Sequence, residues 1–439
     1  MKIKKLSLTL ISACSVLLAG STDENLIDLE KRGEWIALPY AFTSDATGLS
    51  GGVGAIAQGI LQPQTTLVAS VFMGTEQDIV INGNDDTGNF SGAFISLSNL
   101  KIPYTKRMYF SFWGLNKSTP LGIYYLDGSN DSNPDHALVS SGTANYFYST
   151  LSYVLPIGEG TDNPDGKYKL KNGFAMDREE YGNGTPFETG RTTVGVKAFF
   201  QEQDFENWDT SLPWGDYISK PEWNTSGLKF FLSHKNVDFD LNPSRGYSFQ
   251  LQYSKDWGDD LQSWDFLEFE FNKYYTLNTL PYTQQNVLAL NLWTGYSFSW
   301  DTESEVIPGI AAHRPPLDEG SRLGGFFRMR AYDANRFSDK AVLYGTAEYR
   351  AIIDYNPFKS TELKDYTPIA IDWFQVVAFV EAGRVNDEYN LDLLKDMKYD
   401  VGLSLRAMAA ELPVRFDIAY GDEGTSMWVM IKHPFDFFN

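Results

Sequence analysis

The sequence of 439 residues contains one cysteine, four histidines and, after its first twenty residues, no long hydrophobic run. A membrane-spanning helix needs about 18 consecutive apolar residues, so a helical membrane protein is excluded. Lysine and arginine number 36 against 57 acidic residues, and phosphate contacts require clustered basic residues, so nucleic acid is not an expected partner. Scattered histidines without a cysteine cluster predict neither a metal site nor a cofactor.

Aromatic side chains, by contrast, make up 15% of a chain whose mean hydropathy is only -0.30. Disorder is excluded, because disordered chains have few aromatic and β-branched residues. So many rings in so polar a chain need positions where apolar and aqueous surroundings meet. The girdles of Tyr and Trp at membrane interfaces provide such positions.

The N-terminal residues 1–21 have the pattern of a secretory signal peptide, with lysines before an apolar stretch and a small-residue cleavage site at Ala19-Gly20-Ser21. The only cysteine, Cys14, lies inside this signal, and a mature chain without cysteine suits an oxidising compartment. Lipidation of Cys14 is the alternative. We expect residues 22–47 to form a short periplasmic segment and residues 48–439 to form the main domain.

The main domain alternates between apolar and polar residues with a period of two. In residues 246–254, Tyr247, Phe249 and Leu251 share one face and polar side chains share the other. This pattern recurs in about sixteen segments. The candidate strands lie near 50–60, 65–74, 90–99, 107–116, 145–155, 168–176, 192–202, 227–238, 245–256, 264–275, 286–300, 340–353, 374–385, 398–409, 413–422 and 426–438.

The lengths of these segments and of their connections decide the fold class. Many segments have the nine to eleven or so residues that a tilted strand needs to cross a bilayer. Short connections such as 410–412 alternate with long ones such as 203–226 and 301–339, which is typical of outer-membrane barrels. The sequence therefore predicts an all-β fold, a transmembrane antiparallel β-barrel of about 16 strands. Residues 75–145 fit least well, and a soluble β-sandwich or propeller is the alternative.

Residues 323–332, Leu-Gly-Gly-Phe-Phe-Arg-Met-Arg-Ala-Tyr, resemble a motif of the bacterial surface antigen family, the BamA/TamA-like outer-membrane barrel superfamily. The resemblance covers about residues 225–439. It implies a long sixth loop that folds into the barrel, with Met329-Arg330-Ala331-Tyr332 as its tip. Ala331 stands where the family has Gly, which argues against a positive φ at this position.

Residues 379–383, Phe-Val-Glu-Ala-Gly, are similar to the family's Phe-x-Asp-x-Gly motif, with Glu in place of Asp. Alternation places Glu381 on the lumen face, and the resemblance implies that Arg330 reaches it and locks the loop. Neither charge is tolerable in lipid, and a guanidinium fork suits a carboxylate. The alternative is two separate, solvated side chains. The supporting residues of the two motifs are Met329, Ala331, Tyr332, Phe379 and Gly383.

The resemblance also implies a location in the bacterial outer membrane and a role in protein or lipid translocation or outer-membrane biogenesis. The family's periplasmic POTRA domains do not fit before the first expected strand, so a separate periplasmic partner protein and outer-membrane lipid are the expected partners. A passive, cation-preferring porin is the alternative, since sixteen strands can enclose a channel and the chain is acidic. We expect no catalysis, because the four histidines are scattered and the glycine-rich residues 48–54 read as the start of a strand. Their Gly-x-Ser-x-Gly pattern is not a nucleophile elbow, since no helix follows it.

Overall fold

A computed structural model describes most of the chain beyond the N-terminal region. The described residues are 34–44, 48–81, 84–125, 127–176, 178, 181–208, 222–257, 263–300, 313–316, 318–360, 371–409, 412–431 and 434–435. The predicted signal peptide, residues 1–21 with Cys14, lies outside these ranges.

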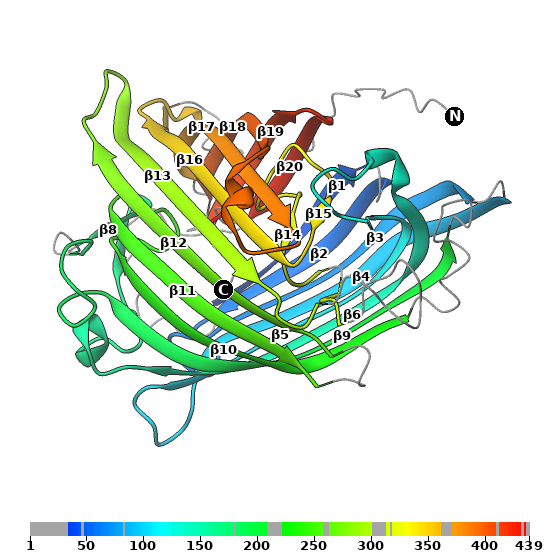
Figure 1. Ribbon diagram of the computed structural model, residues 1–439. Coiled ribbons are helices and arrows are strands. Elements are labelled where there is room, and N and C mark those ends of the chain that lie inside the picture. The colour runs from blue at the N-terminus through cyan, green and yellow to red at the C-terminus, as the bar shows by residue number, and fades with distance from the viewer. Residues whose placement is uncertain are drawn as a thin grey trace.

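One antiparallel sheet of sixteen strands makes up most of the described chain, with the strands in chain order (Figure 1). Its members are β1 (Glu34–Ser44), β2 (Gly48–Gln58), β3 (Thr66–Ile81), β4 (Asn84–Lys101), β5 (Met108–Tyr124), β6 (Leu138–Val154), β9 (Arg191–Trp208), β10 (Glu222–Val237), β11 (Gly246–Asp256), β12 (Asp265–Leu277), β13 (Thr283–Tyr296), β16 (Ala341–Ile353), β17 (Ile371–Asn386), β18 (Lys398–Ala409), β19 (Leu412–Gly421) and β20 (Gly424–Ile431). The sheet curls around a lumen, as the sequence predicts for an all-β barrel. Among the described residues, no pairing joins β1 to β20.

The other elements are short. They are β7 (Lys169–Lys171), β8 (Phe174–Met176), β14 (Arg322–Leu323), β15 (Phe337–Ser338), the α-helix α1 (Pro357–Ser360) and the 3-10 helices η1 (Pro134–His136), η2 (Gly158–Thr161) and η4 (Leu391–Leu394). None of the helices in the described ranges has the length and apolarity to span a membrane.

The sheet has two rims. The rim that we call the loop rim carries the connection of residues 297–340 between β13 and β16, which we call the lumen loop. The opposite rim, the turn rim, carries short turns such as residues 278–282. It also carries the start of β1 and the end of β20, because an even number of antiparallel strands returns to the rim at which it began.

Burial follows the alternation that the sequence predicts. On β17, Glu381 and Phe379 are buried at 0% and 5% exposure, whereas Val376 and Val380 are exposed at 42% and 45%. One face of the strand therefore carries the charged and aromatic side chains into the lumen. The other presents aliphatic side chains outward.

The expected strand set lacks one strand of the main sheet and includes one segment that lies outside it. The sheet begins at β1, residues 34–44, and not at residue 48, so the expected periplasmic segment 22–47 is too long. Pro39 obscures this strand in the sequence, yet proline is tolerated on an edge strand, where no ladder hydrogen bond is lost. Residues 168–176 lie outside the main sheet and form the β7–β8 hairpin, whose turn has positive φ at Asn172 and Gly173.

Residues 75–145 resolve into long strands. β5 continues to Tyr124 after a register shift between Thr119 and Gly122, next to Pro120, and this irregularity hid its second half from pattern analysis. The last strand is shorter than expected. β20 ends at Ile431, and Phe435 leaves the sheet and packs with Tyr274 of β12 inside the barrel.

The connection of residues 155–190 between β6 and β9 runs across the turn rim. Asp165 accepts a hydrogen bond from Tyr109 of β5 at 2.5 Å and pairs with Lys101 of β4. Burial alone would raise the pKa of Asp165, but hydrogen bonds from Lys101, Tyr109 and Lys167 lower it below its ordinary value. Further along, Leu170 is buried among side chains of the opposite wall, Ile352 of β16, Trp373 of β17 and Met408 of β18.

Candidate functional site in the barrel lumen

The tip of the lumen loop enters the barrel through a sequence of unusual backbone conformations. Gly324 and Gly325 have φ of 110° and 103°, and Met329 has φ of 55°. The left-handed residue of the tip is therefore Met329, and Ala331, which replaces the family's Gly, is not among the described residues with positive φ. Leu323 and Phe337 pair in the small sheet β14–β15, which closes the base of the loop.

The structure brings Arg330 and Glu381 together. The backbone N–H of Arg330 donates to Glu381 Oε2 at 2.7 Å, and its Nε lies 3.3 Å from Glu381 Oε1. The hydroxyl of Tyr344 on β16 also donates to Glu381. Both charged side chains have 0% exposure, so the pair is buried rather than two separate side chains exposed to the lumen.

Arg330 has two further carboxylate partners that the sequence analysis did not assign. Its Nη2 lies 3.0 Å from Glu348 of β16, and its Nη1 lies 3.2 Å from Asp417 of β19. The guanidinium therefore spans three strands of the barrel wall. Such a planar fork can serve three carboxylates at once, which a lysine ammonium on a single stem cannot do with the same geometry.

Other arginines surround the same carboxylates. Glu348 also receives Arg350 Nε at 2.8 Å and Arg406 Nη2 at 2.9 Å, and Arg415 pairs with Asp417. Asp400 accepts the backbone N–H of Ala331 at 3.1 Å. We call this set the lock network. Its members are Arg330, Arg350, Arg406, Arg415, Glu348, Glu381, Asp400 and Asp417, so that basic and acidic side chains are equal in number.

The supporting motif residues shape the place of the loop tip. Phe379 lies under the Arg330 guanidinium, 3.4 Å from Cζ to the ring centroid, in a cation–π contact. At Gly383, an added Cβ would lie 2.7 Å from Leu323 and 3.3 Å from Met329, so the absence of a side chain lets the tip approach the wall. The Tyr332 hydroxyl donates to Asp422 at 2.9 Å.

Gly402 of β18 is expected to tolerate no side chain, because it packs closely against Phe379 and the backbone of β19. An added Cβ would lie 2.2 Å from the Phe379 ring and 2.3 Å from the carbonyl oxygen of Ile418. Gly402→Ala should therefore displace Phe379 and lower the free energy of unfolding by ~1–3 kcal/mol, measured by urea unfolding in lipid. The matched control is Gly345→Ala on β16, where the nearest atom would lie at 3.6 Å. Equal stability of the two variants would contradict this packing argument.

A second cluster holds the lumen loop against the opposite wall. Lys229 of β10 donates to both carboxylate oxygens of Glu319 at 2.6 Å, and Gln201 of β9 donates to Glu319 at 2.6 Å. Burial alone would raise the pKa of Glu319, but the charges of Lys229 and Arg322 lower it below its ordinary value. The loop is thus fixed to both sides of the lumen.

Comparison with known protein families identifies this architecture. The Omp85 superfamily domain matches residues 129–431, more than half of the chain. The chain belongs to the Omp85 superfamily. It is an outer-membrane β-barrel protein, and its matched region contains the whole lock network. Comparison with curated proteins gives no significant match.

Three solved Omp85-type structures are similar to this chain in fold. CdiB from Escherichia coli has 10% identity and a TM-score of 0.51 over 90% of this chain and 61% of that one. CdiB from Acinetobacter baumannii has 13% identity and a TM-score of 0.49, with 91% and 58% covered. BamA from Haemophilus ducreyi lacking POTRA domains 1–3 has 13% identity and a TM-score of 0.46, with 91% and 69% covered. The chain thus spans only part of each of these proteins.

An outer-membrane location orients the two rims. Outer-membrane barrels have shorter periplasmic turns and longer external loops, so we assign the turn rim of this Omp85 barrel to the periplasm. Several members of the lock network that sequence analysis missed carried a signal. Glu348, Asp400 and Arg406 all occupy positions on the polar face of an alternating strand. What the sequence did not show is that they join one network around the loop tip.

Proposed function

We propose that this Omp85 chain works in protein or lipid translocation or in outer-membrane biogenesis, with its lumen kept closed at rest by the lumen loop. The observation that supports the proposal is the contact of Arg330 with Glu348, Glu381 and Asp417, all buried inside the barrel. A loop held by four strands of the wall occupies space that a passing substrate needs. Opening therefore requires that the loop tip leaves the lock network.

Release of the loop tip costs free energy, because it separates Arg330 from its buried carboxylate partners. A buried carboxylate that loses its guanidinium partner is destabilised by several kcal/mol, unless water or another cation replaces that partner. We infer that a client segment or a partner protein provides the compensation, and that the closed state dominates without it. No catalytic step is part of this proposal.

The expected partners remain predictions. A separate periplasmic protein would meet the turn rim, where the 155–190 segment and the turns between strands are presented. An affinity pull-down of the full chain from outer membranes would test this part. Enrichment of one soluble periplasmic protein over an unrelated barrel supports it, and recovery of no such protein under crosslinking counts against it.

The porin alternative has no support among the described residues. The channel proposal and the translocation proposal make different predictions for the purified protein in a planar bilayer. A locked lumen should give small and irregular currents. Large, steady, cation-selective steps in the unmodified protein would instead establish a passive channel and overturn the proposed closed state.

A further inference from the structure

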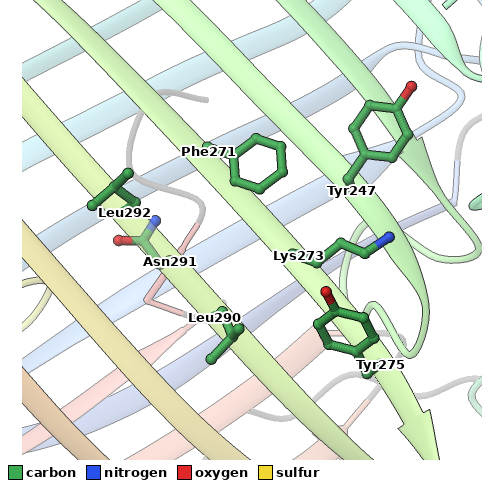
Figure 2. A pocket seen from close by; sticks show the side chains of 7 residues that line it. All are labelled: Tyr247, Phe271, Lys273, Tyr275, Leu290, Asn291 and Leu292. Atoms are coloured by element: carbon green, nitrogen blue, oxygen red, sulfur yellow. The ribbon is translucent and has the colours of Figure 1, made fainter. Parts of the chain in front are cut away.

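The outer face of the barrel has a hollow of about 570 Å³ across β11, β12 and β13 (Figure 2). Its lining residues are Tyr247, Phe271, Lys273, Tyr275, Leu290, Asn291 and Leu292. Most of these side chains alternate with the lumen-facing Glu270, Asn272 and Tyr274 and therefore point away from the lumen. The hollow faces the lipid and not the interior of the barrel.

Lys273 is unusual in this position. From Leu267 to Leu277, the other outward positions of β12 carry only apolar or aromatic side chains, namely Leu267, Phe269, Phe271, Tyr275 and Leu277. The Lys273 ammonium lies 5.7 Å from the ring centroid of Tyr247 and 5.2 Å from that of Tyr275, and Figure 2 shows it between these two rings. Within the described ranges, no carboxylate oxygen lies within 4.0 Å of it.

The hollow lies toward the turn rim. Lys273 is opposite Tyr247 and Leu290 in the strand register, and Tyr247 follows directly on the first residue of β11. The Tyr247 hydroxyl donates to the carbonyl oxygen of Gly184 at 3.1 Å, within the 155–190 segment. Tyrosine and lysine are the residues that settle at headgroup level, where the ring is half-buried and the ammonium reaches polar groups.

We propose that Lys273, with Tyr247 and Tyr275, binds the phosphate of an anionic glycerophospholipid in the periplasmic leaflet. The ammonium supplies the charge that attracts the phosphate, and the Tyr275 hydroxyl supplies an additional hydrogen-bond donor. The Tyr247 hydroxyl already donates to Gly184, so Tyr247 contributes its ring, which flanks the ammonium. Phe271, Leu290 and Leu292 line the part of the hollow that the acyl chains contact. The site is independent of the lumen and of the proposed translocation function.

The charge of Lys273 determines which class of phospholipid the site should prefer. An ammonium near the low-dielectric bilayer core interacts strongly with an anion, because water screens it less there. Phosphatidylglycerol offers a phosphate with an uncharged headgroup. Phosphatidylethanolamine carries its own ammonium, which competes with Lys273 for the same phosphate. We therefore expect preference for the anionic lipid.

Native mass spectrometry of the full chain, purified in detergent and titrated with phosphatidylglycerol or phosphatidylethanolamine, tests this site. One lysine near an anionic membrane surface is worth about 1 kcal/mol, so Lys273→Gln should weaken the affinity for the first phosphatidylglycerol about fivefold. Lys273→Arg should retain it. The matched control is Lys255→Gln, which removes an outward-facing lysine at the loop-rim end of β11 and should leave the affinity unchanged. Heat-dependent migration in gels verifies that every variant is folded.

The alternative outcomes each overturn the proposal. If a folded Lys273→Gln variant binds phosphatidylglycerol as tightly as the unmodified protein, Lys273 does not contribute to lipid binding. An equal loss in Lys255→Gln shows a general effect of surface charge. If phosphatidylethanolamine binds as tightly as phosphatidylglycerol, the site has no preference for an anionic lipid. Displacement of the lipid by millimolar inorganic phosphate would show an ion site and not a lipid site.

Discussion

Glu348→Gln is expected to lower the free energy of unfolding by ~3–5 kcal/mol, because it removes the charge that three buried guanidinium groups share. Arg330, Arg350 and Arg406 lie 3.0, 2.8 and 2.9 Å from its carboxylate oxygens. A neutral amide keeps the size of the side chain but leaves these cations close together without their common partner. Urea unfolding in lipid vesicles, followed by tryptophan fluorescence, measures the change.

Glu206→Gln on β9 is the matched control, since Glu206 is exposed on the strand. Its effect should stay within about 0.5 kcal/mol. The double variant Glu348→Gln with Arg406→Gln should cost less than the sum of the single changes, because each residue is a partner of the other. Strict additivity would show that the two side chains do not interact in the membrane-embedded protein.

Arg330→Ala is expected to release the lumen loop while the barrel remains folded. The variant loses the contacts to Glu348, Glu381 and Asp417 together and leaves these carboxylates buried without that guanidinium. Water that enters the lumen can solvate these carboxylates at the lowest cost in free energy. We therefore expect larger current steps in planar bilayers and cleavage of the lumen loop by protease added at the loop rim.

Lys340→Ala provides the comparison for that experiment. Lys340 belongs to the same loop, but it is partly exposed and lies outside the lock network, so its removal should leave the currents small. Arg330→Lys should have an intermediate effect, because one ammonium cannot reach three strands. A folded Arg330→Ala variant with unchanged currents and a protected loop would show that Glu319 and β14–β15 hold the loop without the lock network.

The sequence was sufficient for the elements in which alternation is regular. The faces of β17 could be predicted because period-two patterning assigns each residue to lumen or lipid. The approach of Arg330 to Glu381 was implied by the family resemblance of the two motifs and not by patterning. Patterning failed where proline or a register shift interrupts it, as at Pro39 of β1 and at Pro120 of β5. It also failed for the β7–β8 hairpin, which alternates like a wall strand but packs across the turn rim.

The composition of the lock network could not be predicted for a different reason. Whether Glu348, Asp400 and Asp417 meet depends on the stagger of β16, β18 and β19 relative to one another, which adds up strand by strand around the barrel. A single sequence places each carboxylate on the lumen face but leaves its depth open. The positive φ of Met329 was hidden similarly, since no residue type at that position signals it.

The wall formed by β16, β17 and β18 is braced from inside at two levels. The lumen loop contacts it through Glu348, Glu381 and Asp400, and the 155–190 segment packs nearer the turn rim on Ile352, Trp373 and Met408. A wall braced in this way is stiff, so any widening of the barrel has its hinge elsewhere in the sheet. Backbone amides of these strands should accordingly be the last to exchange their hydrogens for deuterium.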